Sequence, residues 1–229
     1  MPMPYYVSPE QMMQDKAEYA RKGIAKGKSL VALEYGDGII LAAENPSSSL
    51  SKISEIYDRL SFAGVGKYSE FENLRKSGIR YADIKGYTYS RADVSGKSLA
   101  NAYSQVIGNI FTREIKPLEV EILVAEVGET PDKNSMYHIL FDGSISDRHQ
   151  YAVIGGHAEG VSVFLRDHYK ENCSLNEALL LCRTTLEETI EPKSISVEYL
   201  EVAILDRHLE GRKFRRIYPP EIKERLKVS

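Results

Sequence analysis

The feature of this sequence that most constrains its fold is a pair of apolar runs separated by a short polar turn. Residues 29–35 and 38–44 are rich in Val, Ile, Leu and Ala, and Gly36-Asp37-Gly38 joins them. Gly and Asp tolerate the positive φ angles of tight turns, so this pattern predicts a β-hairpin. Because polar residues do not alternate cleanly with apolar ones, both faces of the hairpin should be buried inside a layered core.

Further strand and helix patterns come in blocks along the chain. Strands are expected at 60–65, 120–127, 136–141, 151–154, 199–206 and 214–217. Helices are expected from a capping box at Ser69 and Glu72, over about 95–115 and 158–169, from a capping box at Ser174 and Glu177, and in the charged stretch 218–229. The order is strands, two helices, strands, two helices, strands. We therefore predict an α/β (α+β) fold, a four-layer α/β/β/α sandwich with its core over 29–217.

An extra helix is expected before the hairpin, over residues 8–24. Ser8 can cap it, Pro9 suits its first turn, and Gln11 can close a capping box. Its narrow apolar face has no partner in the chain before the hairpin, so we expect it to pack on a neighbouring subunit; the face comprises Met13, Ala17, Ala20 and Ile24. A basic run follows, which a solvated face or ion pairs between subunits explain better than a nucleic-acid patch.

Composition limits the class of protein. A chain of 229 residues with 42% hydrophobic residues can bury one large core, so we expect a single domain over 1–229. The formal net charge of −3 gives no reason to expect nucleic acid. Cys173 and Cys182 are too few for a disulfide framework and are expected to be reduced core thiols. No stretch has the length of a membrane span and no signal peptide is evident, so we expect a cytoplasmic protein without membrane contact.

Motifs for catalysis and for cofactors are missing from the sequence. The five histidines are scattered without zinc-site spacing, so neither a metal nor a cofactor is expected. Gly64-Val65-Gly66 lacks the third glycine of a dinucleotide fingerprint, and Gly27-Lys28-Ser29 lacks the upstream glycine of a P-loop. No serine stands in the Gly-x-Ser-x-Gly pattern of a nucleophile elbow.

Over nearly its full length the sequence resembles the proteasome α subunit, most closely the actinobacterial type. The resembling blocks are Tyr5-Tyr-Val-Ser-Pro-Glu-Gln11, Glu18-Tyr-Ala-Arg-Lys-Gly-Ile-Ala25, Ala43-Glu-Asn-Pro46, Lys52-Ile-Ser-Glu-Ile-Tyr-Asp-Arg59, Gly66-Lys-Tyr-Ser-Glu-Phe71 and Asp93-Val-Ser-Gly-Lys97. The resemblance implies the sandwich of the N-terminal-nucleophile (Ntn) hydrolases, which agrees with the predicted layers.

The same family separates catalytic β subunits from α subunits that do not cut peptides. In the β type, processing exposes a threonine at the start of the first core strand, where its own amine acts as base. Lys28 stands at that position here, and Ser29 follows it. The 27 residues before Lys28 include a capped helix, so a free amine could not reach the site without cleavage. Both observations favour a non-catalytic α subunit of a threonine-type endopeptidase complex.

The resemblance also implies partners and sites. An α subunit forms a homo-heptameric outer ring, contacts β-subunit rings, gates their chamber and docks a hexameric AAA ATPase that delivers unfolded, Pup-tagged proteins. Lys52 would bind the C-terminal carboxylate of the activator. The gate would comprise Met1, Pro2, Met3, Pro4, Tyr5, Tyr6, Val7, Ser8 and Pro9, with 1–7 as an uncharged tail. Ring packing would use Tyr19, Arg21, Lys22 and Gly23.

Two departures and two alternatives remain at this point. The Tyr-Asp-Arg motif that organises archaeal and eukaryotic gates is absent from the N-terminal segment, and the spacing from Pro9 to Tyr19 differs by one residue, so the gate geometry does not carry over. One alternative is a catalytic Ntn-type hydrolase in which cleavage makes Ser29 the N-terminal nucleophile, although Ser29 lies one residue late. The other is a free-standing binding protein with the same fold, which would be a monomer.

Overall fold

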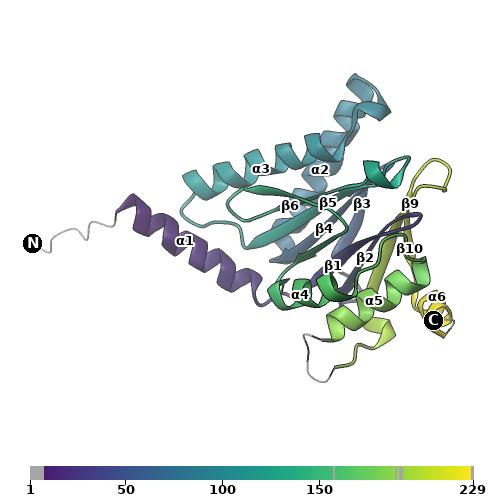
Figure 1. The fold of residues 1–229 in the computed structure, drawn as a ribbon. Coiled ribbons are helices and arrows are strands. Elements are labelled where there is room, and N and C mark those ends of the chain that lie inside the picture. Colours follow the sequence, from purple (N-terminus) through teal and green to yellow (C-terminus); the bar gives the residue numbers. More distant parts are fainter. Residues whose placement is uncertain (1–7, 157, 189, 191–192, 228–229) are drawn as a thin grey trace, which may run out of the picture.

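Two five-stranded antiparallel sheets lie face to face between layers of helices (Figure 1). This computed structural model describes residues 8–156, 158–188, 190 and 193–227. The first sheet has the order β10-β9-β2-β1-β8 and contains β1 (Leu30–Tyr35), β2 (Gly38–Glu44), β8 (Tyr151–Ile154), β9 (Leu200–Asp206) and β10 (Phe214–Ile217). The second has the order β3-β4-β5-β6-β7 and contains β3 (Ile53–Tyr57), β4 (Leu60–Gly66), β5 (Val120–Glu126), β6 (Ser135–Ile139) and β7 (Ile145–Arg148).

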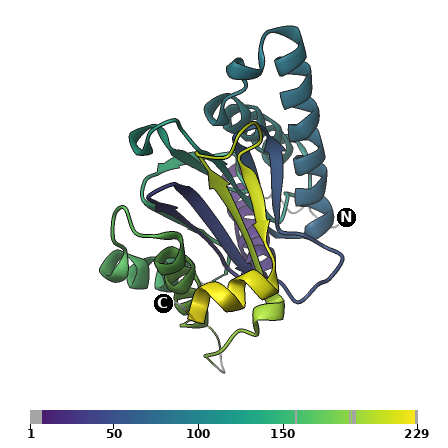
Figure 2. The ribbon, with the colours of Figure 1, turned by 90° about the vertical axis from the view of Figure 1, so that its right-hand side faces the viewer.

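Each sheet is covered on its outer face by one pair of helices. The second sheet packs against α2 (Tyr68–Thr88) and α3 (Gly96–Arg113). The first packs against α4 (Ala158–His168) and α5 (Leu175–Glu187), with α6 (Pro219–Lys227) beside α5. Figure 2 shows α6, in yellow, at the opposite end of the view from the tip of α2. The predicted four-layer sandwich is confirmed.

The hairpin of β1 and β2 is buried on both faces, as its composition predicts. Successive side chains of a strand point to opposite faces, so neighbours in β1 enter different cores. Val31 and Leu33 pack toward α5, whereas Leu30 and Ala32 pack between the two sheets. All four are fully buried. At the turn, a side chain on Gly38 would place its Cβ 1.8 Å from the carbonyl oxygen of Leu205, so only glycine fits there.

The structure decides which strands share a sheet. The strand expected at 60–65 is β4, which pairs with β5 in the second sheet, and β8 lies beside β1 in the first. Two strands, β3 and β7, were missed. Both are short edge strands that carry polar residues, and β7 ends in the exposed pair Asp147 and Arg148. Such strands lack the apolar density that marked the buried ones.

Capping predictions had mixed outcomes. Ser174 and Glu177 form the predicted capping box of α5. The box at Ser69 is wrong: α2 begins at Tyr68, and the Glu72 carboxylate instead accepts two hydrogen bonds from Arg75, both 2.7 Å long. Ser8 does cap α1 (Pro9–Ile24), whereas the Gln11 side chain donates to Asp15. Of the two thiols, Cys182 lies in the core as predicted and Cys173 is only half-buried.

The helix α1 projects from one end of the sandwich (Figure 1). Its last turns pack within the chain: Ala20 and Ile24 are buried against Phe141. We expected the whole apolar face of α1 to pack on another subunit, and this expectation was wrong for the C-terminal half of the helix. Met12 and Met13, nearer the free end, are 49% and 37% exposed. Across the described ranges, no helix combines the length and apolarity that a bilayer crossing requires.

Candidate functional site

Lys52 lies at the end of a polar loop between β2 and β3, and the loop folds on its own side chains. The backbone N–H of Ser47 donates to Asn45 Oδ1 over 3.1 Å, and Asn45 Nδ2 donates to the Leu50 carbonyl over 2.6 Å. The Leu50 N–H in turn donates to Ser47 Oγ over 3.1 Å. Asn and Ser form such local bonds readily, which is why a Pro- and Ser-rich segment can have a fixed shape.

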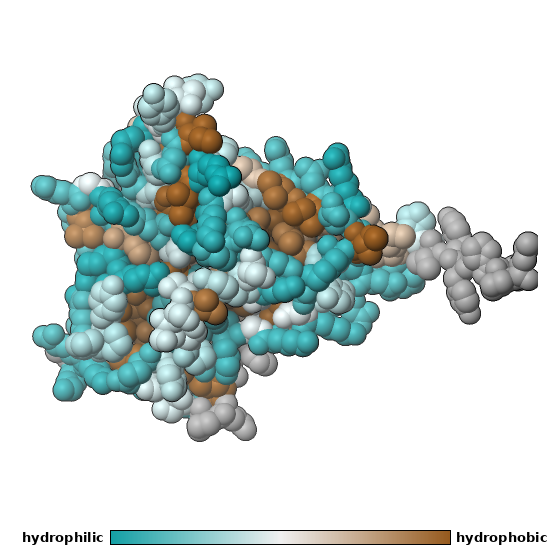
Figure 3. Space-filling model, turned by 180° about the vertical axis from the view of Figure 1, so that it is seen from behind, coloured by the Kyte–Doolittle hydropathy of each residue, from teal (hydrophilic) through white to brown (hydrophobic). Residues whose placement is uncertain are grey.

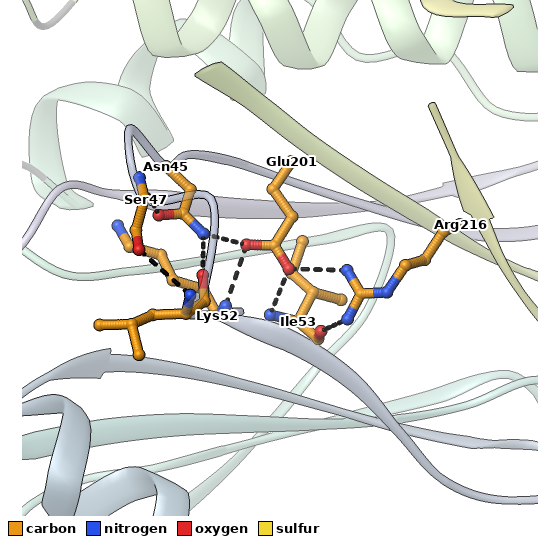
Figure 4. A network of polar contacts seen from close by, with 7 residues as sticks. Asn45, Ser47, Lys52, Ile53, Glu201 and Arg216 are labelled. Carbon is orange, nitrogen blue, oxygen red and sulfur yellow. Dashed lines mark hydrogen bonds and ion pairs between the residues drawn. The ribbon is translucent and has the colours of Figure 1, made fainter. Parts of the chain in front are cut away.

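The loop is tied to the core by the carboxylate of Glu201 on β9 (Figure 4). Glu201 Oε2 accepts from Asn45 Nδ2 over 2.7 Å and from the Lys52 N–H over 2.9 Å. Glu201 Oε1 accepts from the Ile53 N–H over 3.1 Å and from Arg216 Nη1 over 2.8 Å. The Glu201 side chain is only 10% exposed. One carboxylate thus joins the loop, β3, β9 and β10.

The amine of Lys52 reaches back to the beginning of the first core strand. Its Nζ donates to the Lys28 carbonyl over 3.1 Å. Lys28 itself turns away and pairs with Glu44, 3.1 Å from Nζ to Oε2. Burial lowers the pKa of Lys52 to about 8; the carboxylates of Glu201 and Glu44 oppose this effect, and the charge of Lys28 adds to it. Lys52 is therefore a cation in a partly dehydrated, well-defined position.

Ser29, the alternative nucleophile, is buried and, among the described residues, makes no contact of the kind that activates a hydroxyl. It is 5% exposed, and its Oγ has no hydrogen-bond partner within the described chain. Gly155, with φ of +105°, packs on it so closely that a Cβ there would lie 3.2 Å from Ser29 Cα. A serine nucleophile needs a base within hydrogen-bond reach. Among the described residues, the intact chain offers Ser29 none; only cleavage before Ser29 would free an amine that could act as its base.

Two of the four residues expected in ring packing meet one common neighbour, Glu119. The Tyr19 hydroxyl donates to Glu119 Oε1 over 3.3 Å. A Cβ on Gly23 would lie 2.2 Å from Glu119 Oε2, so glycine lets the helix approach this carboxylate. Lys116 pairs with Glu119 over 2.9 Å and lies over the Tyr19 ring at 5.5 Å.

The other two residues expected in ring packing point elsewhere. Arg21 lies over the ring of Phe141, 5.5 Å from its centroid. Lys22 pairs with Glu18 over 2.6 Å at the surface, with 73% of its side chain exposed. The four residues therefore do not form one pocket within a single chain.

A groove of about 570 Å³ runs between α1 and the end of α3, lined by Met12, Lys16, Tyr19, Ile115 and Pro117 among others. Ile115 is 95% exposed there, and Figure 3 shows apolar surface, in brown, beside the N-terminal end of α1.

Of the expected gate residues, Ser8 is the N-cap of α1 and Pro9 its first residue. The remaining gate residues, 1–7, lie outside the described residues.

Sequence reasoning missed Glu201 and Arg216 and gave Asn45 no role of its own. Asn45 stands in one of the quoted blocks, which was a usable signal. Glu201 is 149 residues from Lys52 in the chain, and it carries no local signal because one acidic residue in an apolar strand usually marks its solvent side. Within the described part of the chain, no group of acidic, His or Cys residues could hold a metal ion.

The fold and this site define a class of protein: a four-layer α/β/β/α sandwich in which a lysine amine binds the backbone at the start of the first core strand. The profile of the family described as proteasome subunit matches residues 24–205, and the chain belongs to that family.

Relatives within the family show the subunit type. A proteasome subunit alpha of Acidothermus cellulolyticus is 52% identical over 100% of both chains. That of Thermobifida fusca is 54% identical, covering 95% of this chain and 88% of its own, and that of Thermomonospora curvata is 52% identical, covering 99% and 98%. The chain is similar to these actinobacterial alpha subunits over 95% to 100% of its length, and it has the role of a proteasome alpha subunit.

Proposed function

We propose that this chain is a non-catalytic α subunit that forms heptameric outer rings, gates entry to a β-subunit chamber and docks the C-termini of a hexameric ATPase. One observation carries the proposal: the Lys52 amine is held 3.1 Å from the Lys28 carbonyl, at the place where a catalytic subunit would have its free terminal threonine. Here the peptide continues through that place. The position serves for binding charge and not for attacking a peptide.

Docking follows from the chemistry of Lys52. A carboxylate that leaves water needs a fixed positive partner, and a charge-assisted contact contributes roughly 1.5 to 3 kcal/mol. The Lys52 amine is already partly dehydrated, and the backbone of Lys52 is fixed by Glu201. Binding a carboxylate would therefore cost little further ordering of this residue. A ring repeats the site, so modest contacts multiply through avidity. The ligand would be the C-terminal carboxylate of an ATPase chain whose last three residues are a hydrophobic residue, a tyrosine and any residue (hydrophobic-Tyr-any).

Ring formation and gating are proposed from α1. Its free end presents Met12 and, in the groove beside it, Ile115, and both are apolar and exposed. A neighbouring copy of this chain would cover them, since exposed apolar patches of this kind mark interfaces. The uncharged tail 1–7 would then lie near the ring axis. The substrates would be unfolded, Pup-tagged proteins in the cytoplasm.

The two alternatives are less well supported. A serine hydrolase would require cleavage before Ser29, whose hydroxyl is buried without a partner in the described chain. In a free-standing, monomeric binding protein the apolar residues beside α1 would stay exposed to solvent. No specific observation favours either one.

The test is co-expression with a β-subunit partner, followed by native mass, peptide hydrolysis and stimulation by a ring ATPase with the stated C-terminus. The parent should assemble and respond to the ATPase. The Lys52→Ala particle should assemble with the same native mass as the parent. It should lose most of the stimulation, so that at least tenfold more activator is needed for the same rate of peptide hydrolysis. Lys133→Ala removes an exposed lysine from a turn before β6 and is the matched control, which should respond like the parent. A Lys52→Ala particle that responds equally well would refute the docking role.

A further inference from the structure

We infer that Glu201 is the positioning residue of the docking site: its carboxylate fixes the backbone of Lys52 and holds the Lys52 amine in its binding position and charge state. The inference rests on the proposed docking function and names the part of the molecule on which that function depends. Glu201 does not touch the activator. It acts through Lys52.

The first argument is the hydrogen-bond chemistry. All four groups around the Glu201 carboxylate are donors: the backbone N–H groups of Lys52 and Ile53, Asn45 Nδ2 and Arg216 Nη1. Each carboxylate oxygen accepts two of them. An ionised carboxylate is acceptor-only and fits this arrangement, whereas an amide would turn its own N–H₂ group toward two donors. The position therefore requires a carboxylate and not merely a polar side chain of the same size.

The second argument is mechanical. Glu201 belongs to β9 in the first sheet, whereas Ile53 begins β3 at the edge of the second. Its bonds to β3 and to the loop thus cross between the sheets at the point where Lys52 begins its reach toward Lys28. Arg216 on β10 strengthens the connection, because it donates both to Glu201 and to the Ile53 carbonyl. Two backbone bonds also hold the loop, from the Asn45 N–H to the Tyr199 carbonyl over 2.7 Å and from the Gly64 N–H to the Lys52 carbonyl over 3.0 Å. The Glu201 carboxylate adds the side-chain bonds that join the two ends of the loop, Asn45 and Lys52, to each other.

The third argument is electrostatic. The charged groups facing Lys52 are Glu201 on β9, Glu44 on β2 and Lys28 before β1, and Arg216 lies behind Glu201. Burial and Lys28 lower the pKa of Lys52, and the two carboxylates oppose them. Loss of the Glu201 charge would also leave Arg216 without its acidic partner. Lys52 would then lose its proton at a lower pH.

The experiment uses the assembled particle and a synthetic peptide that ends in hydrophobic-Tyr-any, with binding measured by fluorescence anisotropy from pH 6 to 9.5. Four particles are compared: the parent, Glu201→Gln, Lys52→Ala and the control Glu198→Gln. Glu198 lies just before β9 and pairs with Lys223 at the surface, so its loss should not alter binding. For Glu201→Gln we expect at least tenfold weaker binding at pH 7 and a pH midpoint for binding lower than that of the parent.

The outcomes separate this inference from the proposed function. If Lys52→Ala binds like the parent, the docking function itself fails. If Lys52→Ala loses binding but Glu201→Gln does not, only the positioning role fails. If Glu201→Gln weakens binding by the same factor at every pH, its effect is general loosening and the inference is overturned. Native mass and thermal unfolding of each particle exclude loss of assembly as the cause.

Discussion

At the scale of single residues, the charge of Lys52 depends on its surroundings. Taking an ammonium group out of water disfavours its charged form, and nearby carboxylates restore part of the loss. In this chain the balance leaves the pKa of Lys52 at about 8 instead of 10.5. Between these two values the unfolded chain binds more protons than the folded one, so this group makes folding stability rise with pH there. At neutral pH the protonated amine is a stability cost that the docking role would explain.

The first residue-scale prediction is that activator stimulation falls as pH rises through about 8, because Lys52 then loses the charge that attracts a carboxylate. Bound carboxylate favours the protonated amine, so the midpoint should move upward as activator concentration increases. Activator dose curves from pH 6.5 to 9.5 check this, with activator-independent peptide hydrolysis measured at each pH. A stimulation that stays constant to pH 9.5 would contradict the assignment.

A second residue-scale prediction concerns Ser29. The purified chain alone should show no peptidase activity, and Ser29→Ala should leave the activity of the assembled particle unchanged, because in the uncleaved chain the buried hydroxyl has no base among the described residues. Intact mass gives an independent check. A mature chain that begins at Ser29, or activity that disappears with the Ser29 hydroxyl, would favour the hydrolase alternative.

At the scale of elements, the tasks proposed for α1 and for the tail before it can be tested separately. Ser8 caps the helix, with its Oγ accepting the Gln11 N–H over 3.2 Å, so the helix has a fixed start that does not depend on residues 1–7. A helix start that is capped by its own side chain tolerates truncation before it. The tail can thus be removed without loosening the helix.

The element-scale prediction is that deletion of residues 1–7 raises peptide hydrolysis by the assembled particle and leaves its native mass that of the parent less the deleted residues. The physical reason is that the deletion opens the pore but spares the capped helix. Replacement of the same seven residues by a Gly-Ser segment of equal length is the control for simple occupancy. Unchanged hydrolysis in a correctly assembled particle would show that the tail is not the gate.

At the scale of the whole molecule, α1 contributes little to the sandwich core. Its buried residues are Lys16, Ala20 and Ile24, whereas the sheets and the other helices supply the large clusters. Lys16 also donates to the Phe111 carbonyl over 3.0 Å. The helix should therefore matter more for contacts between copies than for folding of one copy.

The prediction at this scale is that removal of residues 1–24 leaves a folded sandwich that no longer forms rings. Loss of the buried Ile24 side chain costs roughly 1.5–3 kcal/mol, so the melting temperature should fall by about 5–10 °C without loss of cooperativity. Circular dichroism and native mass measure the two effects. Rings that persist without α1 would contradict the proposed packing.

The sequence by itself determined the layers. Runs such as residues 29–35 are apolar without alternation, and burial on two faces is the physical reason for such a run, so the central hairpin was predictable. Capping at Ser8 and Ser174 was also predictable, because a cap is a local hydrogen bond between residues three apart in the chain. The one resembling block that contains Lys52 pointed to the candidate site.

Only the tertiary structure decided which strands share a sheet and what holds Lys52. The strand that begins at Leu60 pairs with Val120–Glu126, and sequence order could not reveal this because pairing depends on the path of the intervening helices. Glu201 on β9 of the first sheet contacts Lys52 in the loop that leads into β3 of the second sheet, and the two residues are 149 apart in the chain. Hydrogen bonds of that kind leave no periodic trace in a sequence, because each is set by the packing of two layers and not by the spacing of neighbours along one element.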